Sequence, residues 1–387
     1  MKKRVVFTVL GSLLWLSCGN NHDMMYRPEY QYPSYTKDMQ VPTGERGETF
    51  KEIKENPFVE VSSQPVSTFS VDVDRAAYSN IRRMIQQGTL PPKDAVRIEE
   101  MINYFDYDYP TPDAQTPSPL RVSYEQAPAP WNTTHYLLRI GLKTKPLDLS
   151  NTPASHLVFL IDVSGSMMDY NKLPLLKSSL KLLLQNLKPQ DKVSIVTYAS
   201  GTQVALEPTS VREREKIEKV LDGLEAGGAT SGERGIQLAY EQAHKAFIKG
   251  GNNRIILATD GDFNVGINNP NDLKAFIEKQ REGGVYLSVL GFGMGNYRDD
   301  MSETLADSGN GNYAYIDNLT EAKKVLVNEF GGTLFTVAKD VKLQVEFNPK
   351  YVKQYKLLGY ENRMLANEDF TNDKKDAGEV GAGHTVT

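Results

Sequence analysis

The sequence predicts an α/β fold in which a doubly wound, mostly parallel sheet is inserted into a small β-rich flanking domain with an N-terminal helical unit. Two observations carry this prediction. Between residues 155 and 330, unbroken runs of Val, Ile and Leu alternate with amphipathic helical patterns, as in a sheet covered by helices on both faces. On either side of that region, shorter segments alternate apolar and polar residues, which is typical of half-buried strands.

The N-terminus has the pattern of an export signal. Three basic residues, 2–4, precede a short apolar run, Val5–Leu16, and the single cysteine, Cys18, follows directly. The run is shorter than the about 20 residues that span a bilayer. Residues 16–19 resemble the bacterial lipoprotein cleavage site, so we expect 1–18 to be a lipoprotein-type signal peptide, Cys18 to be lipidated, and the protein to be held at the membrane of the cell envelope, periplasmic or at the surface. An ordinary cleaved signal with a chance cysteine is the alternative.

Residues 19–65 are rich in Tyr, Pro, Asn and Gln and show no apolar period, which predicts a flexible tether. Asn56–Val59 and the alternation that follows it offer an alternative, in which this part docks as an edge strand.

Residues 66–150 predict an N-terminal extension with helices and strands. A strand at Thr68–Asp74 leads into a helix at Arg75–Gln87, and a second helical pattern spans Val96–Phe105. Leu120–Thr144 then predicts two β-strands around a Pro-rich turn. Within the first strand Asp72 and Asp74 share one face, which we expect to be solvated.

Residues 151–332 predict the doubly wound domain. Its expected strands are His156–Asp162, Val193–Tyr198, Ile255–Asp260, Val285–Gly291 and Tyr313–Ile316. Its expected helices are Leu173–Leu187, Val211–Leu224, Gly235–Ile248, Asn271–Glu282 and Thr320–Phe330. In residues 333–387 the β-pattern returns, most clearly at Val341–Phe347, so we expect this C-terminal extension to pair with the N-terminal one into a single sheet domain.

Polar side chains follow two of the expected strands where ligands bind doubly wound sheets, beyond the carboxyl ends. Asp162, Ser164 and Ser166 come directly after the first strand, and Asp260 ends another. Thr230 lies in a Gly-rich loop over the same edge. These donors are all hard oxygens, which suit Mg²⁺, or Mn²⁺ or Ca²⁺, in place of zinc or copper.

The three pieces together resemble the metal-ion-dependent adhesion site (MIDAS) of von Willebrand factor type A domains: Asp-x-Ser-x-Ser, a loop threonine and a later Asp-Gly. The resemblance implies a Rossmann-like fold in which Ser164, Ser166 and Thr230 bind the metal directly. Asp162 and Asp260 are then expected to act through water or directly. It further implies a protein partner that supplies an acidic residue to the metal, and therefore adhesion-type binding without catalysis.

The likeness extends to bacterial lipoprotein-like members of that family. The segments that carry it are Asn56–Asn80, Gly291–Asp299, Gly309–Asp317 and Gly359–Arg363. In that subgroup the C-terminal extension continues further, so we expect the extension in this chain to be truncated.

Charge and composition restrict the competing functions. The net charge of −5 is spread along 387 residues, which argues against nucleic-acid binding. Five histidines show no ligand spacing, and Gly291, Gly293 and Gly295 do not have the spacing of a dinucleotide-binding loop. Two alternatives remain. One is a metal-dependent hydrolase with Asp169 or Asp262 as its base, and the other is a structural envelope protein with a vestigial metal site.

Overall fold

The structure, a computed structural model, describes most of the chain after residue 46. The described residues are 47–113, 118–146, 152–230, 234–261, 270–295, 297–329, 331–332, 335–372 and 377–387. The predicted signal peptide, Cys18 and the first part of the predicted tether therefore lie outside them. No helix among the described residues has the length and apolar character needed to cross a membrane.

A six-stranded sheet forms the centre of the molecule, and it confirms the predicted fold class. Its strand order is β10 (Tyr313–Tyr315), β9 (Val285–Gly291), β8 (Asn252–Thr259), β5 (Ser155–Asp162), β6 (Lys192–Tyr198) and β7 (Thr202–Ser210). All neighbouring pairs are parallel except β6 and β7. Every residue of β5 and β8 is buried, because helices cover both faces of the sheet.

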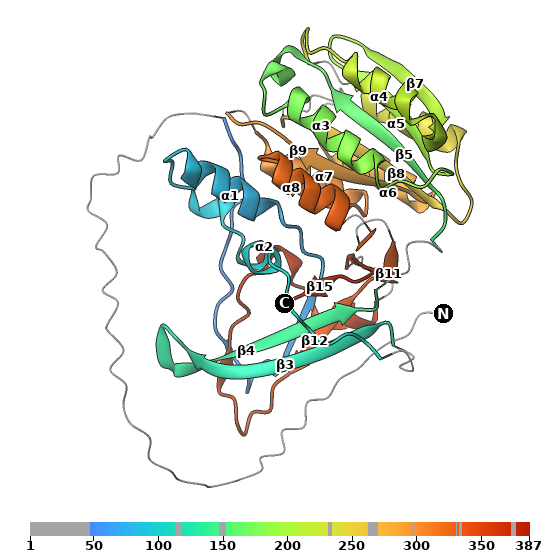
Figure 1. Ribbon diagram of the computed structural model, residues 1–387. Helices are drawn as coiled ribbons and strands as arrows, with labels where there is room; N and C mark the ends of the chain where they lie inside the picture. The colour runs from blue at the N-terminus through green and yellow to red at the C-terminus, as the bar shows by residue number, and fades with distance from the viewer. Residues whose placement is uncertain are drawn as a thin grey trace, which may run out of the picture.

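Two helical layers sandwich the sheet (Figure 1). On one face α3 (Leu173–Leu184), α4 (Arg214–Asp222) and α8 (Leu319–Lys323) share a core with Leu157, Phe159 and Ile161 of β5. On the other, α5 (Gly235–Lys245), α6 (Pro270–Glu282) and α7 (Asp299–Ser308) surround Val158 and Leu160. Short helical turns complete these layers at Gly165–Met168 (η3), Val211–Glu213 (η4) and Lys324–Asn328 (η5).

Two elements of this domain were not among those expected from the sequence. Strand β7 runs antiparallel to β6 after a tight turn in which the Ala199 amide donates to the Gly201 carbonyl at 2.9 Å. The sequence pattern did not predict helix α7, because its buried face includes Asp299, Ser302 and Glu303, which do not produce an apolar stripe.

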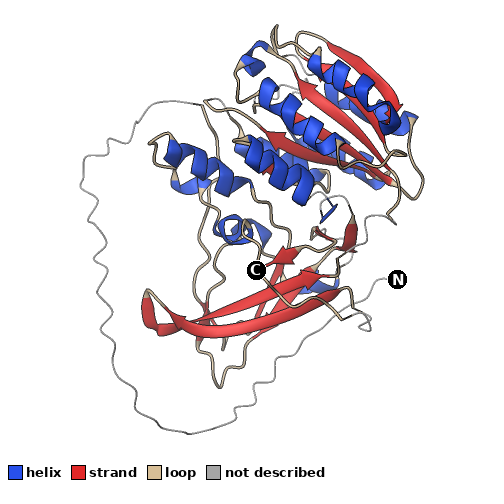
Figure 2. Cartoon of the chain, in the orientation of Figure 1, coloured by secondary structure: helices blue, strands red, loops and turns tan. Residues whose placement is uncertain are grey.

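Strands that precede the central domain pair with strands that follow it, but among the described residues they form four small sheets in place of the single sheet expected (Figure 2). β2 (Val66–Ser70) lies antiparallel to β12 (Lys342–Glu346), and the hairpin of β3 (Leu120–Ala129) and β4 (Asn132–Thr144) receives β15 (Thr385–Val386). Two shorter pairs join β11 (Thr336–Lys339) to β14 (Glu379–Gly381), and β1 (Val59–Glu60) to β13 (Gln354–Tyr355). Phe69, Leu142, Tyr360 and Val386 belong to their common core, beside the turns η6 (Glu361–Arg363) and η7 (Asn367–Thr371).

Residues 47–65 do not behave as the predicted tether. Val61 is buried, and the side-chain Nδ2 of Asn56 donates to the carbonyls of Leu357 and Gly359 at 3.3 and 3.0 Å. The amide of Thr49 donates to the Tyr297 carbonyl at 3.0 Å. The alternative of a docked edge strand is the better description of this segment. Backbone and side-chain hydrogen bonds hold it against the fold, although its sequence has no apolar period.

The first N-terminal helix covers the β10 edge of the central sheet. α1 (Ala76–Gln86) follows directly on Asp74, and a turn at Lys93–Ala95 (η1) precedes α2 (Ile98–Asn103). The Ser79 hydroxyl donates to the Tyr315 carbonyl at 2.7 Å, and Ala76 belongs to the core of the central domain. Sequence position therefore assigns α1 to the extension, whereas its packing joins it to the sheet.

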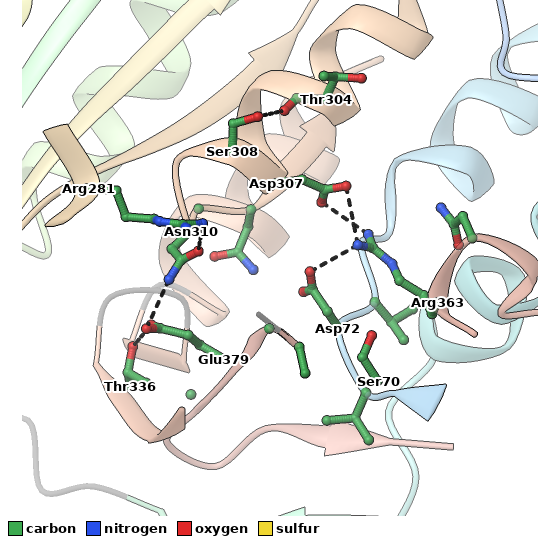
Figure 3. Close-up of a pocket in the computed structure, with 18 of the residues that line it drawn as sticks. Ser70, Asp72, Arg281, Thr304, Asp307, Ser308, Asn310, Thr336, Arg363 and Glu379 are labelled. Carbon is green, nitrogen blue, oxygen red and sulfur yellow. Dashed lines mark hydrogen bonds and ion pairs between the residues drawn. The ribbon is translucent and has the colours of Figure 1, made fainter. Parts of the chain in front are cut away.

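The seam between the central and flanking domains is polar, which corrects the expectation for Asp72 and Asp74. Asp74 is buried and accepts from the Tyr313 amide at 2.8 Å. Arg363 lies 3.3 Å from Asp72 and 3.1 Å from Asp307, across a pocket of about 460 Å³ (Figure 3). Asp72 and Asp74 face the seam because Arg363 of the C-terminal extension, a largely covered side chain, lies 3.3 and 3.8 Å from them.

Candidate metal site

The first site loop begins where β5 ends. Asp162 is fully buried there, and its Oδ1 accepts from the Ser164 amide at 2.8 Å, which turns the chain back over the strand end. The hydroxyls of Ser164 and Ser166 lie 3.0 Å apart. Ser164 is buried and Ser166 is exposed, so this pair extends from the strand end to the surface.

The threonine loop is bonded to the first loop. The Gly165 amide donates to the Gly228 carbonyl at 2.9 Å, and the Gly227 amide donates to the Val163 carbonyl at 2.8 Å. Gly228 has a φ of +81°, and a Cβ there would lie 2.4 Å from the Ser200 hydroxyl oxygen, so the loop needs glycine at this position. Thr230, two residues further, is partly buried.

Asp260 directly follows β8, the strand next to β5, and is fully buried. Its Oδ2 accepts from the Lys172 ammonium at 2.9 Å. Gly261 then turns with a φ of +96°, where a Cβ would lie 2.5 Å from the Arg298 amide. Asp262, one of the two bases considered for hydrolysis, lies outside the described residues.

Electrostatics set Asp162 apart from an ordinary helix-capping or turn-forming aspartate. Burial, together with the charge of Asp260, raises the pKa of its carboxyl to about 6, against hydrogen bonds from Ser164 and Tyr198 that lower it. Its Oδ2 is buried and makes no hydrogen bond of normal geometry among the described residues, although the nearby Tyr198 hydroxyl stabilises the charged carboxyl. A buried carboxylate oxygen without a donor is costly, and a cation would satisfy it.

The donor set fits a hard divalent cation. The described residues contain no group of three or more His, Cys, Asp and Glu side chains able to hold a metal. A cation at this edge would therefore depend on hydroxyls as well as on the two carboxylates, and Ser164, Ser166 and Thr230 lie on the loops that supply them. Such neutral oxygens suit Mg²⁺ or a similar ion.

Sequence reasoning missed one charged neighbour of the site, Lys172. It lies at the start of α3, and only its spatial pairing with Asp260 reveals it. It also explains Gly293, whose φ is +77° and where a Cβ would lie 2.2 Å from the Lys172 Cε. The Gly-rich segment after β9 thus makes room for a lysine stem.

Comparison with known families decides the identity of the central domain. Residues 156–328 match the model of the von Willebrand factor type A domain. The chain belongs to the von Willebrand factor type A domain proteins. Residues 44–139 match a second model described as von Willebrand factor, and 332–387 match the C-terminal model of the uncharacterized protein YfbK.

Relatives of this von Willebrand A protein include uncharacterized YfbK of Escherichia coli (strain K12), 50% identical over 343 residues, which are 87% of this chain and 60% of YfbK. The chain thus spans less than two thirds of that relative. Among solved structures, BatB of Bacteroides thetaiotaomicron is 21% identical, covering 46% of this chain and 97% of that one, with a TM-score of 0.39. Mussel proximal thread matrix protein 1, described with a zinc-occupied MIDAS motif, is 19% identical, covering 46% and 45%, with a TM-score of 0.37.

Histidines do not contribute to the site of this von Willebrand A domain among the described residues. His156 is buried against Ser194, and His384 directly precedes β15 in the flanking domain. His135 and His244 are exposed. Asp169 is exposed beside η3. Among the described residues, the functional groups at the site are therefore carboxylates, hydroxyls and one ammonium.

Proposed function

We propose that the protein is an envelope-anchored lipoprotein whose von Willebrand A domain binds a protein partner through a divalent cation, with Mg²⁺ favoured. Ser164, Ser166 and Thr230 would hold the cation directly, and Asp162 and Asp260 would hold it directly or through water. When bound, the cation supplies a positive position that accepts a carboxylate from the partner. The protein binds and does not catalyse.

The observation that carries this proposal is the buried Asp162 Oδ2, which makes no hydrogen bond of normal geometry among the described residues and lies in a loop with two adjoining serine hydroxyls. The hydrogen bonds of Gly165 and Gly227 support it, because they hold the threonine loop against the serine loop. For an aspartate that only capped a turn, both carboxylate oxygens would be expected to be well hydrogen-bonded or exposed to water.

Affinity capture tests the binding function. Tagged protein in solubilised envelopes should retain a partner in the presence of Mg²⁺, and chelator should release that partner while the circular dichroism of the protein stays unchanged. Thr230→Ala should weaken capture even where metal is retained. Turnover of a phosphate or ester substrate that needs the metal, without any metal-dependent partner, would favour the hydrolase instead. Metal binding with neither partner nor turnover would favour the vestigial site.

The anchor is tested separately, since it rests on residues 1–18 alone. Mass spectrometry of the mature protein should find Cys18 at the N-terminus with its lipid attached. Cys18→Ala should abolish that modification and leave the protein uncleaved or soluble after export. A mature N-terminus at another residue, without acyl mass, would contradict the lipoprotein assignment.

A further inference from the structure

Lys172 brings a fixed positive charge into the metal site. Its ammonium lies 2.9 Å from Asp260 Oδ2, and the exposed fractions of the two side chains are 6% and 0%. An ion pair so completely removed from water is weakly screened, so its charge acts on any ion bound nearby. Neither the metal-site motif nor the capping of α3 requires a cation at this position.

The lysine is held in place along its whole length. Its backbone amide donates to the Asp169 carbonyl at 3.0 Å, and its carbonyl accepts from the Leu176 amide at 2.8 Å. Its stem fills the space that a side chain at residue 293 would take, with the Cβ of any such residue 2.2, 2.8 and 2.9 Å from Lys172 Cε, Cγ and Cδ. The ammonium is therefore a built part of the site.

We infer that Lys172 is a positioning residue that makes the site hold its cation weakly alone and more tightly once an external carboxylate joins it. This inference rests on the proposed function and deepens it. Since the ammonium occupies Asp260 Oδ2, Asp260 cannot bind a cation through both oxygens. The two aspartates and the lysine together carry one negative charge, so a divalent cation here keeps one positive charge uncompensated.

That uncompensated charge has two opposite consequences. Repulsion by Lys172 lowers the affinity of the empty site for the metal, and the same charge raises the affinity of the loaded site for an anion. Removing the charge should therefore move the two affinities in opposite directions. A lysine that only supported the local structure would not do this, because its loss would disorder Asp260 and weaken both.

Lys172→Met tests the inference, with Mn²⁺ and acetate as probes that need no partner. Calorimetric titration should show Mn²⁺ binding about tenfold more tightly than in wild type, and water-proton relaxation should show acetate binding the Mn²⁺-loaded protein about tenfold more weakly. Lys172→Arg, which keeps the charge, should stay near wild type for both probes. Unchanged or weaker Mn²⁺ binding in Lys172→Met, or equal effects of the two substitutions, would overturn the inference.

Two further measurements keep these outcomes distinct. Gly293→Ala displaces the lysine stem without removing a charged residue. It should therefore strengthen Mn²⁺ binding and weaken acetate binding, as Lys172→Met does. It also provides the test if Lys172→Met does not fold. No shift with Gly293→Ala in a folded protein would contradict the inference. If wild type itself binds no Mn²⁺, the proposed function fails. If wild type binds Mn²⁺ but the substitutions do not change the affinities as expected, only the role of Lys172 fails.

Discussion

The Gly165 amide donates a hydrogen bond of 2.9 Å to the Gly228 carbonyl, and this contact fixes the serine loop against the threonine loop. Gly228→Ala should disturb it, because the new Cβ would meet the Ser200 hydroxyl at 2.4 Å and the φ of +81° disfavours alanine. We expect metal affinity to fall by about tenfold or more, with a loss of about 1–2 kcal/mol in unfolding free energy. Calorimetric titration and urea unfolding measure the two effects.

Gly201→Ala is the matched control for that variant. Gly201 also lies in a loop near the site edge, but it has no atom within 4 Å of an added Cβ. Metal affinity should stay at the wild-type value. An equal loss in both variants would mean that general loop disturbance, and not the contact between Gly165 and Gly228, lowers the affinity.

Arg82 joins the N-terminal helix to the end of the central sheet, and its loss should destabilise the protein. Its guanidinium lies 2.5 Å from Asp317 and 2.8 Å from Glu321, whose carboxylates are both 3% exposed. Arg82→Met leaves these carboxylates buried without their cation. Since Arg82 is itself 25% exposed, we expect a loss of about 2–3 kcal/mol by urea unfolding at pH 7.

Lys245→Met provides the comparison for Arg82. Lys245 lies 2.8 Å from Glu207, but their side chains are 56% and 57% exposed, so this pair should contribute less than about 1 kcal/mol. A loss for Arg82→Met as small as that for Lys245→Met would show that α1 is not held to the sheet by these charges.

His156 should make the protein less stable in acid. Burial lowers the pKa of this histidine to about 4, so the folded state favours the neutral ring. Its contribution is therefore fully present above pH about 6.5, and it is lost as the pH falls towards 4, to a limit of about 3 kcal/mol. His156→Gln should flatten this part of the stability profile, measured by urea unfolding between pH 7 and pH 4.

His244→Gln should leave the acid profile unchanged, because His244 is exposed and bonded to Gln280. If His156→Gln and His244→Gln gave the same profile as wild type, another group would be responsible for the acid loss.

Metal binding should itself depend on pH through Asp162. Burial raises the pKa of this carboxyl to about 6, so a proton competes with the cation below that pH. The affinity should be constant above pH about 7 and fall by up to about tenfold per pH unit below pH about 6. Titrations at pH 5, 6 and 7.5 check this, and equal affinities at pH 5 and 7.5 would contradict the role given to Asp162.

Local pattern was enough to predict the five parallel strands of the sheet and to nominate the site residues. The strands β5 and β8 are unbroken apolar runs, and the carboxyl ends of adjacent parallel strands meet at one edge. Pairings between distant residues could not be predicted in the same way. Lys172 beside Asp260, and Arg363 beside Asp72, have no signature in sequence spacing. Helix α7 could not be predicted either, because its buried face is partly charged and includes Glu303.

Calorimetric titration of Mg²⁺ and Mn²⁺ into wild type and into Asp162→Ala with Ser164→Ala tests the central claim most directly. We predict one site in the wild type and none in the double variant. Its fold should persist, because Asp162→Ala removes a carboxylate whose charge is disfavoured by burial at the end of β5. Asp222→Ala with Ser178→Ala, at exposed positions on the outer helices, should bind as wild type does. Unchanged metal binding in the Asp162 and Ser164 double variant would contradict the account.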